Sequence, residues 1–281
     1  MKGILNVNKP QGWTSFDVVN YLKKFLNTKH IGHLGTLDPM ATGVLPVTIG
    51  SATKLFDLFL SKAKTYIAKF EFGYTTDTLD ATGQIVEKTE KTPTIDEIKE
   101  ILPKFVGEIK QVPPMYSAKK INGRKAYDIA REGETIELKP NKIFIKNLEI
   151  LDYSNNILKM KIECGAGTYI RAIGRDIANE LNTLATMTEL TRTEVGIFKL
   201  EDSVSVKDLS KEELIDKILP TDITFNHYPI IDDETLVFRL LNGQTVITGL
   251  DDGEYRVYKD NEFVALASAQ NNKLKMTKYF A

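Results

Sequence analysis

The chain has 281 residues, 42% hydrophobic and 27% charged, and its 37 Lys and Arg against 38 Asp and Glu give a formal net charge of −1. This composition excludes a wholly disordered chain, a collagen and a coiled-coil rod. A single cysteine excludes an internal disulfide framework and a multi-cysteine metal site. No apolar run approaches the roughly 20 residues that span a bilayer, and none of signal-peptide length opens the chain. We therefore predict a cytoplasmic protein without membrane contact.

The first part of the chain predicts one helix, a glycine-rich loop and one strand. In residues 16–26 apolar side chains recur at helical spacing, and Ser15 in front of them is a typical N-cap. Residues 30–50 contain too many glycines for a helix, so we expect a loop there. Residues 65–73 alternate between apolar and polar side chains, which predicts a strand with Tyr66 on its inner face.

A capped helix and a basic arm follow. Thr94 and Glu97 form a capping box in front of an apolar repeat, which predicts a helix. Residues 113–133 carry turn signals, and from Lys110 to Lys125 five side chains are basic and none is acidic. We interpret this segment as a projecting arm, although a solvated charged face would give the same charge pattern.

Further helices and strands are expected in the second half of the chain. Residues 156–165 alternate and predict a strand, followed by a glycine turn and a helix from about Arg171. Another helix begins after Ser210. Beyond Pro220, turn pairs such as Asn242-Gly243 and Asp260-Asn261 separate short apolar runs and are typical of β-hairpins. We therefore expect a small all-β module at the end of the chain.

Common nucleotide and metal motifs are absent from the sequence. Gly165-Ala166-Gly167 lacks the third glycine of a dinucleotide-binding loop, since position 170 is Ile. There is no phosphate-binding loop of the G-x-x-x-x-G-K-[ST] type and no G-x-S-x-G, and the three histidines do not form an H-E-x-x-H pair. No metal is expected, and carboxylates and cations remain as catalytic candidates.

The most unusual segment is residues 32–50, GHLGTLDPMATGVLPVTIG. Its glycines permit tight turns and the close approach of a ligand. Pro39 restricts Asp38 to extended geometry, which would hold the carboxylate out from a stiffened loop. An Asp-Pro pair also starts ordinary turns, and local physics alone favours that explanation.

This segment closely resembles the catalytic signature of the TruB family of tRNA pseudouridine synthases, and six further segments resemble motifs of that family in family order. They are GILNVNKPQGWTSFDVV (a Lys-Pro motif), KTYIAKFEFG (a tyrosine motif), QVPPMYSAKKINGRKAYDIAREG (an RNA-clasping insertion), CGAGTYIRAIGRDIA (an arginine motif), ELTRTEVGIF (a leucine–arginine motif) and VFRLLNGQTV through FVALASA (a PUA-like module).

The resemblance implies a mixed α/β (α+β) pseudouridine synthase fold with a large, mainly antiparallel sheet. The catalytic domain would occupy residues 1–225, with the RNA-clasping insertion near 108–146. A small PUA-like β domain over 226–281 would bind RNA away from the target loop.

The resemblance also implies roles for individual residues. Asp38 would be the catalytic carboxylate, Arg171 would pair with it, and Tyr66 would stack on the extruded uracil. Lys9 and Leu190 would line the pocket.

A sixth residue, His33, would help to displace the target base from its stack in the RNA loop. Where many relatives carry Leu-Arg-Arg, this chain has Leu-Thr-Arg over residues 190–192. Contacts to RNA phosphates are expected from five cations: Lys119, Lys120, Arg124, Lys125 and Arg192.

The chemistry of pseudouridine formation fits these residue types. The reaction replaces an N–C glycosidic bond by a C–C bond without net redox change, so no cofactor is expected. A carboxylate can act as nucleophile or base when ionised, and a guanidinium beside it favours that form and fixes its direction. A base inside a folded loop has to be flipped out before it can react.

Taken singly, the same residues have ordinary structural explanations. Tyr66 and Leu190 would be core residues, and Arg171 a surface ion pair. His33 would be a polar loop residue and Lys9 a solvated lysine. Only the joint pattern favours catalysis.

We therefore expect a monomeric isomerase that converts uridine 55 to pseudouridine in the T-arm of tRNA, without cofactor or guide RNA. Three alternatives stay open. A guide-RNA-dependent relative would be inactive on bare tRNA, and an RNA-binding or RNA-folding module would bind without isomerisation. A glycoside hydrolase would need two carboxylates flanking the bond, and the sequence offers one convincing candidate, Asp38.

Overall fold

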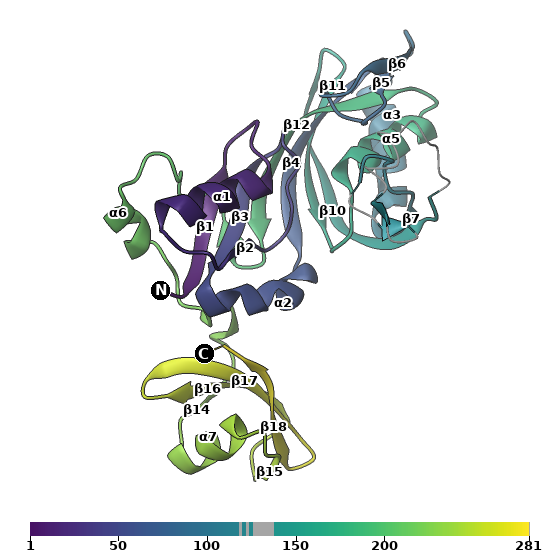
Figure 1. Ribbon diagram of the computed structural model, residues 1–281. Coiled ribbons are helices and arrows are strands. Elements are labelled where there is room, and N and C mark those ends of the chain that lie inside the picture. Colours follow the sequence, from purple (N-terminus) through teal and green to yellow (C-terminus); the bar gives the residue numbers. More distant parts are fainter. Residues whose placement is uncertain (118–119, 122–123, 126–137, 281) are drawn as a thin grey trace.

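The computed structural model describes residues 1–117, 120–121, 124–125 and 138–280. A nine-stranded sheet forms the centre of the larger part of the molecule, with the path β1-β3-β12-β4-β11-β10-β7 and with β2 and β13 paired at its sides (Figure 1). Of its strand pairs, β12 with β3 is parallel and the others are antiparallel. This confirms the mixed α/β fold with a large, mainly antiparallel sheet. The strands are β1 (Gly3–Lys9), β2 (Ile31–His33), β3 (Thr42–Ile49), β4 (Lys64–Phe72), β7 (Gly107–Gln111), β10 (Asn141–Ser154), β11 (Ile157–Cys164), β12 (Ala185–Val195) and β13 (Phe198–Lys199).

Helices pack around this sheet, and capping boxes begin three of them. The boxes at Thr94 and Ser210 confirm two predicted helix starts. The first helix is capped by Thr14 rather than Ser15, because Thr14 exchanges hydrogen bonds with Asp17. Ser15 Oγ instead accepts from the backbone nitrogen of Leu37 at 2.8 Å and so holds the segment before Asp38. The helical elements are α1 (Ser15–Phe25), η1 (Gly50–Leu55), α2 (Phe56–Leu60), α3 (Ile95–Ile101), η2 (Leu102–Phe105), α5 (Ile170–Glu180), α6 (Lys211–Asp216) and η3 (Ile223–Phe225).

Residues 30–50 were predicted to form a loop, but both ends of this segment form strands, β2 and β3. The glycine at position 43, which suggested a loop, lies within β3. A side chain there would place its Cβ 2.2 Å from the carbonyl oxygen of Arg192, and the residue has a φ of 101°. Glycine is present because β3 and β12 approach closely, and only residues 34–41 remain as the loop that carries Asp38.

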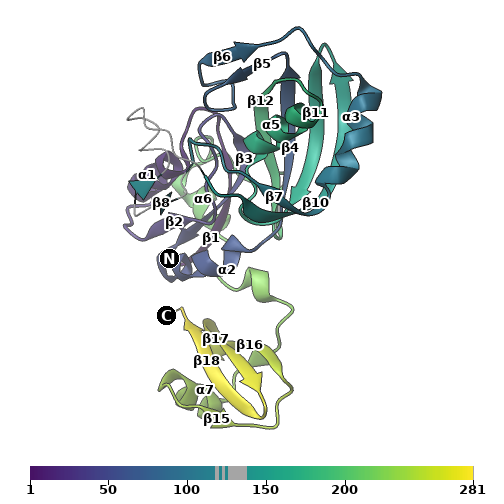
Figure 2. The ribbon, with the colours of Figure 1, turned by 90° about the vertical axis from the view of Figure 1, so that its right-hand side faces the viewer.

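The alternating segments form the strands that were predicted from them. In β4 the side chains of Tyr66, Ala68, Phe70 and Phe72 are buried, and β11 likewise buries its apolar face. Helix α5 lies on β4 and on the neighbouring strand β12 (Figure 2). A Cβ at Gly174 of α5 would lie 2.3 Å from Cδ1 of Phe70, so glycine permits the close contact that brings Arg171 over the sheet.

A five-stranded sheet forms the C-terminal module, as predicted, but the module also contains one helix and so is not all-β. Asn242-Gly243 ends that helix instead of turning a hairpin, since Gly243 donates to the carbonyl of Leu240 at 2.9 Å. Asp260-Asn261 does turn a hairpin, with φ of 51° and 62°. The elements are β14 (Ile230–Ile231), α7 (Glu234–Leu241), β15 (Val246–Ile247), β16 (Gly253–Lys259), β17 (Glu262–Gln270) and β18 (Lys273–Tyr279).

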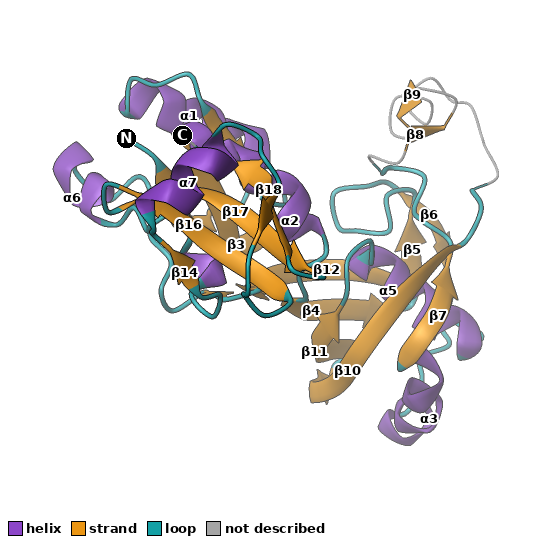
Figure 3. Cartoon of the chain, turned by 90° about the horizontal axis from the view of Figure 1, so that it is seen from below, coloured by secondary structure: helices purple, strands orange, loops and turns teal. Residues whose placement is uncertain are grey.

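Two small hairpins complete the described elements: β5 (Tyr74–Thr76) with β6 (Ile85–Lys88), and β8 (Lys120–Ile121) with β9 (Arg124–Lys125). The second hairpin belongs to the predicted basic arm (Figure 3). Lys119 lies outside the described residues, and for Lys120, Arg124 and Lys125 the structure describes the backbone alone. In the described part of the chain, no helix is both long and apolar enough to cross a membrane.

Candidate active site

A cavity of about 540 Å³ opens between the Asp38 loop, the start of α5 and the sheet. Four segments distant in sequence meet there. The loop contributes Asp38, α5 contributes Arg171, and β4 and β12 contribute Tyr66 and Leu190. Four of the six residues expected in the pocket therefore line one space.

The Arg171 guanidinium binds the Asp38 carboxylate through two nitrogens. Nε lies 3.0 Å from Oδ2, and Nη2 donates to Oδ1 at 3.4 Å. Arg171 itself is buried and is held by the carbonyls of Thr78 and Tyr116, at 2.9 and 3.0 Å. The Asp38 side chain keeps 35% exposure. One face of the carboxylate is thus fixed by the arginine while another faces the cavity.

A second carboxylate, Asp80, approaches the same guanidinium and was missed in the sequence. Its Oδ2 lies 3.4 Å from Nη1 of Arg171, and its Oδ1 accepts from Thr78 Oγ1 at 2.8 Å and from the backbone nitrogen of Thr82 at 3.0 Å. The sequence did indicate the turn that holds Asp80. Residues 76–83, TDTLDATG, are rich in Asp and Thr, whose side chains bond neighbouring backbone groups in tight turns.

Burial raises the pKa of the Asp38 carboxyl above its ordinary value. The charge of Arg171 lowers this pKa, as expected, and that of Asp80 raises it, but the effect of burial is the largest. Asp38 therefore becomes ionised at a higher pH than an exposed aspartate does.

Arg192, expected to bind RNA phosphate, is instead 1% exposed. Its guanidinium donates to the carbonyls of Val44, Gly35 and Thr36 at 2.8, 3.1 and 3.4 Å. All three nitrogens are engaged inside the protein. A side chain buried in this way does not reach an RNA phosphate, in contrast to the expectation. The contacts of Arg192 instead hold the loop that carries Asp38.

Lys9 is also buried and is not among the described residues that line the cavity. Its Nζ donates to the carbonyls of Pro10 and Pro39, at 3.0 and 3.2 Å, and to that of Trp13. Burial lowers its pKa to about 8. The expectation that Lys9 lines the pocket is therefore wrong, and the lysine supports the backbone directly after Asp38.

His33 lies on β2, outside the cavity that contains Asp38. It lines a neighbouring cavity of about 370 Å³, which shares Gly35 and Thr36 with the first. Burial lowers the pKa of His33, so the neutral ring is favoured. The shared wall places His33 next to the pocket without placing it in contact with Asp38.

Comparison with known proteins identifies the family. The model of the TruB family pseudouridylate synthase N-terminal domain matches residues 23–170. The chain belongs to the TruB family. The tRNA pseudouridine synthase B of Clostridium kluyveri is 41% identical, over 100% of both chains. That of Borreliella afzelii is 42% identical, over 99% of this chain and 98% of its own.

Solved structures agree with this family assignment. A crystal structure of a Cbf5–Nop10–Gar1 complex contains a chain similar to this TruB family member, with a TM-score of 0.75 and 26% identity. The match covers 99% of this chain and 85% of the other. The C-terminal module is therefore included in the likeness.

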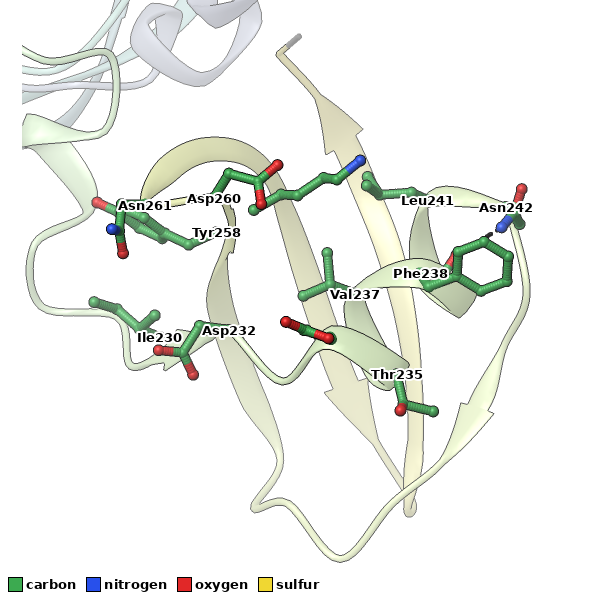
Figure 4. Close-up of a pocket in the computed structure, with 12 residues that line it drawn as sticks. Ile230, Asp232, Thr235, Val237, Phe238, Leu241, Asn242, Tyr258, Asp260 and Asn261 are labelled. Atoms are coloured by element: carbon green, nitrogen blue, oxygen red, sulfur yellow. Dashed lines mark hydrogen bonds between the residues drawn. The ribbon is translucent and has the colours of Figure 1, made fainter.

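A larger cavity of about 1120 Å³ lies in the C-terminal module, between α7 and the β16–β17 turn (Figure 4). Asp232 and Asp260 line it together with the exposed ring of Phe238. Among the described residues, three carboxylates, Asp232, Glu234 and Asp260, line it against one cation, Lys259, so this wall is acidic on balance and repels RNA phosphates. The smaller cavity, where a carboxylate is paired and accessible, is the candidate active site in this TruB family member.

Proposed function

We propose that the protein isomerises uridine 55 to pseudouridine in the T-arm of tRNA, without a guide RNA, and that it acts as a monomer. Relatives named tRNA pseudouridine synthase B match the chain over its whole length. The observation that carries the proposal is the Asp38–Arg171 ion pair, which faces an accessible cavity beside Tyr66. In this proposal residues 226–281 form a PUA-like domain that binds RNA away from the target loop.

The first step is removal of the target base from its stack in the RNA loop. Tyr66 and Leu190 supply an aromatic and an aliphatic wall on adjacent strands, and such surfaces take up an extruded base. In this proposal His33, which lines the neighbouring cavity, fills the space that the base leaves in the RNA loop. The pocket thereby offsets part of the stacking energy lost by the RNA.

The second step requires an ionised Asp38. Three paths start from this carboxylate: attack on ribose C1′, attack on uracil C6, or removal of the C2′ proton. In each, Arg171 holds the attacking group in one direction, and its own position is fixed by the carbonyls of Thr78 and Tyr116. The detached uracil then rotates, and its C5 forms the new bond to ribose C1′. Asp38 is released from the adduct or gives back the C2′ proton, C5 loses its hydrogen as a proton, and N1 takes up a proton.

The alternatives are less well supported. A glycoside hydrolase needs two carboxylates across the bond, whereas Asp38 is the one carboxylate among the described residues that line the cavity. Asp80 lies behind Arg171 and is buried. The chain of the Cbf5–Nop10–Gar1 complex is 26% identical to this chain, whereas the tRNA pseudouridine synthase B of Clostridium kluyveri is 41% identical, which favours an enzyme that acts on tRNA without a guide.

The test is incubation of the purified protein with a T-arm minihelix and with a full tRNA transcript, followed by mapping of pseudouridine. We expect pseudouridine at the target uridine alone, with no guide RNA added. A minihelix with cytidine at that position is the matched control. Binding without modification would show an RNA-binding module, and modification only after addition of a guide RNA would favour the guide-dependent alternative.

A further inference from the structure

The side chain of Gln111 joins the sheet to the helix that carries Arg171, and it has no role in the mechanism above. Gln111 ends β7, is 1% exposed and is not among the described residues that line the cavity. Its Oε1 accepts from the backbone nitrogen of Tyr169 at 2.9 Å, and its Nε2 donates to the carbonyl oxygen of the same residue at 3.2 Å. One buried amide therefore binds both backbone groups of a single residue that lies 58 positions further along the chain.

The residue that Gln111 holds is the N-cap of α5. Tyr169 stands directly before Ile170, where the helix begins. The side chain of an N-cap residue usually accepts a hydrogen bond from the first turn and so fixes the helix start, but Tyr169 makes no such bond. The start of α5 therefore lacks the usual local restraint, and Gln111 supplies a restraint from β7.

Arg171 is the second residue of α5, so its direction depends on where the helix begins. Its Nε lies 3.0 Å from Oδ2 of Asp38. A shift of the helix start moves the guanidinium together with the backbone, and a misplacement of about 1 Å in a catalytic group can cost on the order of 10²-fold in rate. The hydrogen bonds from Gln111 to Tyr169 thus act on the ion pair through two residues of backbone.

Two further hydrogen bonds join the segment 111–116 to the same helix. Arg171 Nη2 donates to the carbonyl of Tyr116 at 3.0 Å, and Arg175 Nη2, one turn later, donates to that of Val112 at 2.7 Å. Two buried prolines lie between these carbonyls, and their rings fix the backbone φ. The segment therefore offers α5 a stiff support, to which the helix start and its first two turns are attached.

We propose that Gln111 is a positioning residue for the catalytic ion pair, because it fixes the start of α5 and thereby directs the Arg171 guanidinium toward Asp38. Gln111 acts through Tyr169 and does not touch the substrate. The proposal rests on the proposed function, in which the direction of the Asp38 carboxylate matters for the rate. Loss of this side chain should therefore impair the reaction and leave RNA binding nearly intact.

The first test separates the rate from RNA binding. Gln111→Met keeps the length of the side chain and removes both hydrogen bonds, so the single-turnover rate at saturating RNA should fall on the order of 10²-fold, with less than about a threefold change in RNA affinity. Asn6→Leu is the matched control. Asn6 is also a buried amide, and it donates to the carbonyl of Lys199 at 2.8 Å, outside the cavity. The control should keep a rate near that of the wild type, and urea unfolding measures the stability that each variant loses.

The second test uses pH to distinguish positioning from general destabilisation. Burial raises the pKa of the Asp38 carboxyl, the charge of Arg171 lowers it, that of Asp80 raises it and that of Lys9 lowers it. A displaced Arg171 lowers this pKa less. The acid limb of kcat/KM should therefore move by about half a pH unit or more to higher pH in Gln111→Met, and it should stay in place in the control.

A third measurement follows the arginine itself and does not depend on activity. In NMR spectra of protein with isotope-labelled arginine, the Nε–H proton of Arg171 is protected from water where it faces Asp38. Its exchange with water should be about tenfold faster in Gln111→Met than in the wild type, since the ion pair is less well held. The control should show the exchange rate of the wild type.

Gln111→Asn is the second variant and decides the question if Gln111→Met does not fold. Its amide is shorter by one methylene and cannot bind both backbone groups of Tyr169 unless the helix start moves, so the same three changes are expected. An unmoved acid limb, unchanged exchange at Arg171, or an equal loss of rate in Asn6→Leu would each overturn the positioning role. Failure of the wild-type protein to form pseudouridine would instead refute the proposed function.

Discussion

Two arginine–aspartate pairs in this molecule have the same separation and different surroundings. Arg171 Nε lies 3.0 Å from Asp38 in the candidate active site, and Arg256 Nη1 lies 3.0 Å from Asp222 where the C-terminal module joins the rest. Asp222 has 6% side-chain exposure against 35% for Asp38. The distance between the charges therefore does not distinguish a reactive pair from a structural one.

The partners of each carboxylate make the difference. Asp222 also accepts from the hydroxyl of Tyr258, and Arg256 binds the side chain of Asn226 and the carbonyl of Tyr228. Every contact of that pair lies within the protein. At Arg171 a second carboxylate shares the guanidinium, and Asp38 keeps a face toward an open cavity. The comparison teaches that an ion pair can do chemistry when its carboxylate remains accessible to a substrate.

The largest effect is expected from Asp38→Asn. Removal of the group that attacks or accepts a proton should lower the rate of conversion by about 10³-fold or more, while RNA affinity changes only a few-fold. The measurement is tritium release from RNA labelled at C5 of uridine, beside a filter-binding titration. Release at a near wild-type rate would show that Asp38 is not the catalytic carboxylate.

Asp80→Asn tests whether the shared guanidinium matters. The amide should keep the bonds to Thr78 and Thr82 but turn its NH₂ toward Arg171, so misplacement of Asp38 should cost on the order of 10²-fold in rate. Activity needs ionised Asp38 and so falls as pH falls through its raised pKa. Without the negative charge of Asp80 that pKa decreases, and the acid limb of kcat/KM should move to lower pH. An unmoved limb would mean that the charge of Asp80 does not act on Asp38.

The opposite result is expected from Asp222→Asn. Weakening a buried pair should lower the free energy of unfolding by about 3 kcal/mol, because Arg256 is left without its counter-charge. The rate at saturating RNA should stay near that of the wild type. Urea unfolding and single-turnover conversion measure the two quantities. A large loss of rate without a loss of stability would remove the distinction between the two pairs.

The smallest effect concerns the basic arm. Replacement of Lys119, Lys120, Arg124 and Lys125 by Ala should make the salt dependence of RNA binding shallower, by up to about one unit of slope for each charge that contacts a phosphate. Conversion at saturating RNA should change little. An unchanged slope would exclude these four residues as phosphate contacts. A control with equal charge loss replaces exposed lysines near α3: Lys88, Lys91, Lys99 and Lys104.

Much of the fold could be predicted because local rules coincide with the tertiary structure. Alternation gave the correct inner faces of β4 and β11, and two capping boxes marked the starts of α3 and α6. Two of the errors have one cause. Gly43 and Gly243 suggested a loop and a hairpin, but one permits two strands to approach and the other ends α7. A glycine in a sequence does not show whether it forms a turn, permits two strands to approach closely or ends a helix.

The site was predictable only in part. Asp38, Tyr66, Arg171 and Leu190 do meet, as the family resemblance implied. The resemblance implied that Lys9 lines the pocket and that Arg192 contacts RNA, but both are buried. Nothing local in the sequence shows that backbone carbonyls will surround these side chains. Asp80 was missed because its partner lies 91 residues away in sequence, beyond the reach of a local pattern.

The hydrogen bonds from Arg192 to the Asp38 loop determine when, during synthesis of the chain, that loop can reach its final conformation. This arginine donates to Val44 and Gly35, which precede it by 148 and 157 residues. A nascent chain carries the reactive aspartate early but cannot give its loop the final shape until β12 has emerged. Truncated translation products that end before residue 192 should therefore be inert toward RNA, which delays the chemistry until most of the polypeptide has been synthesised.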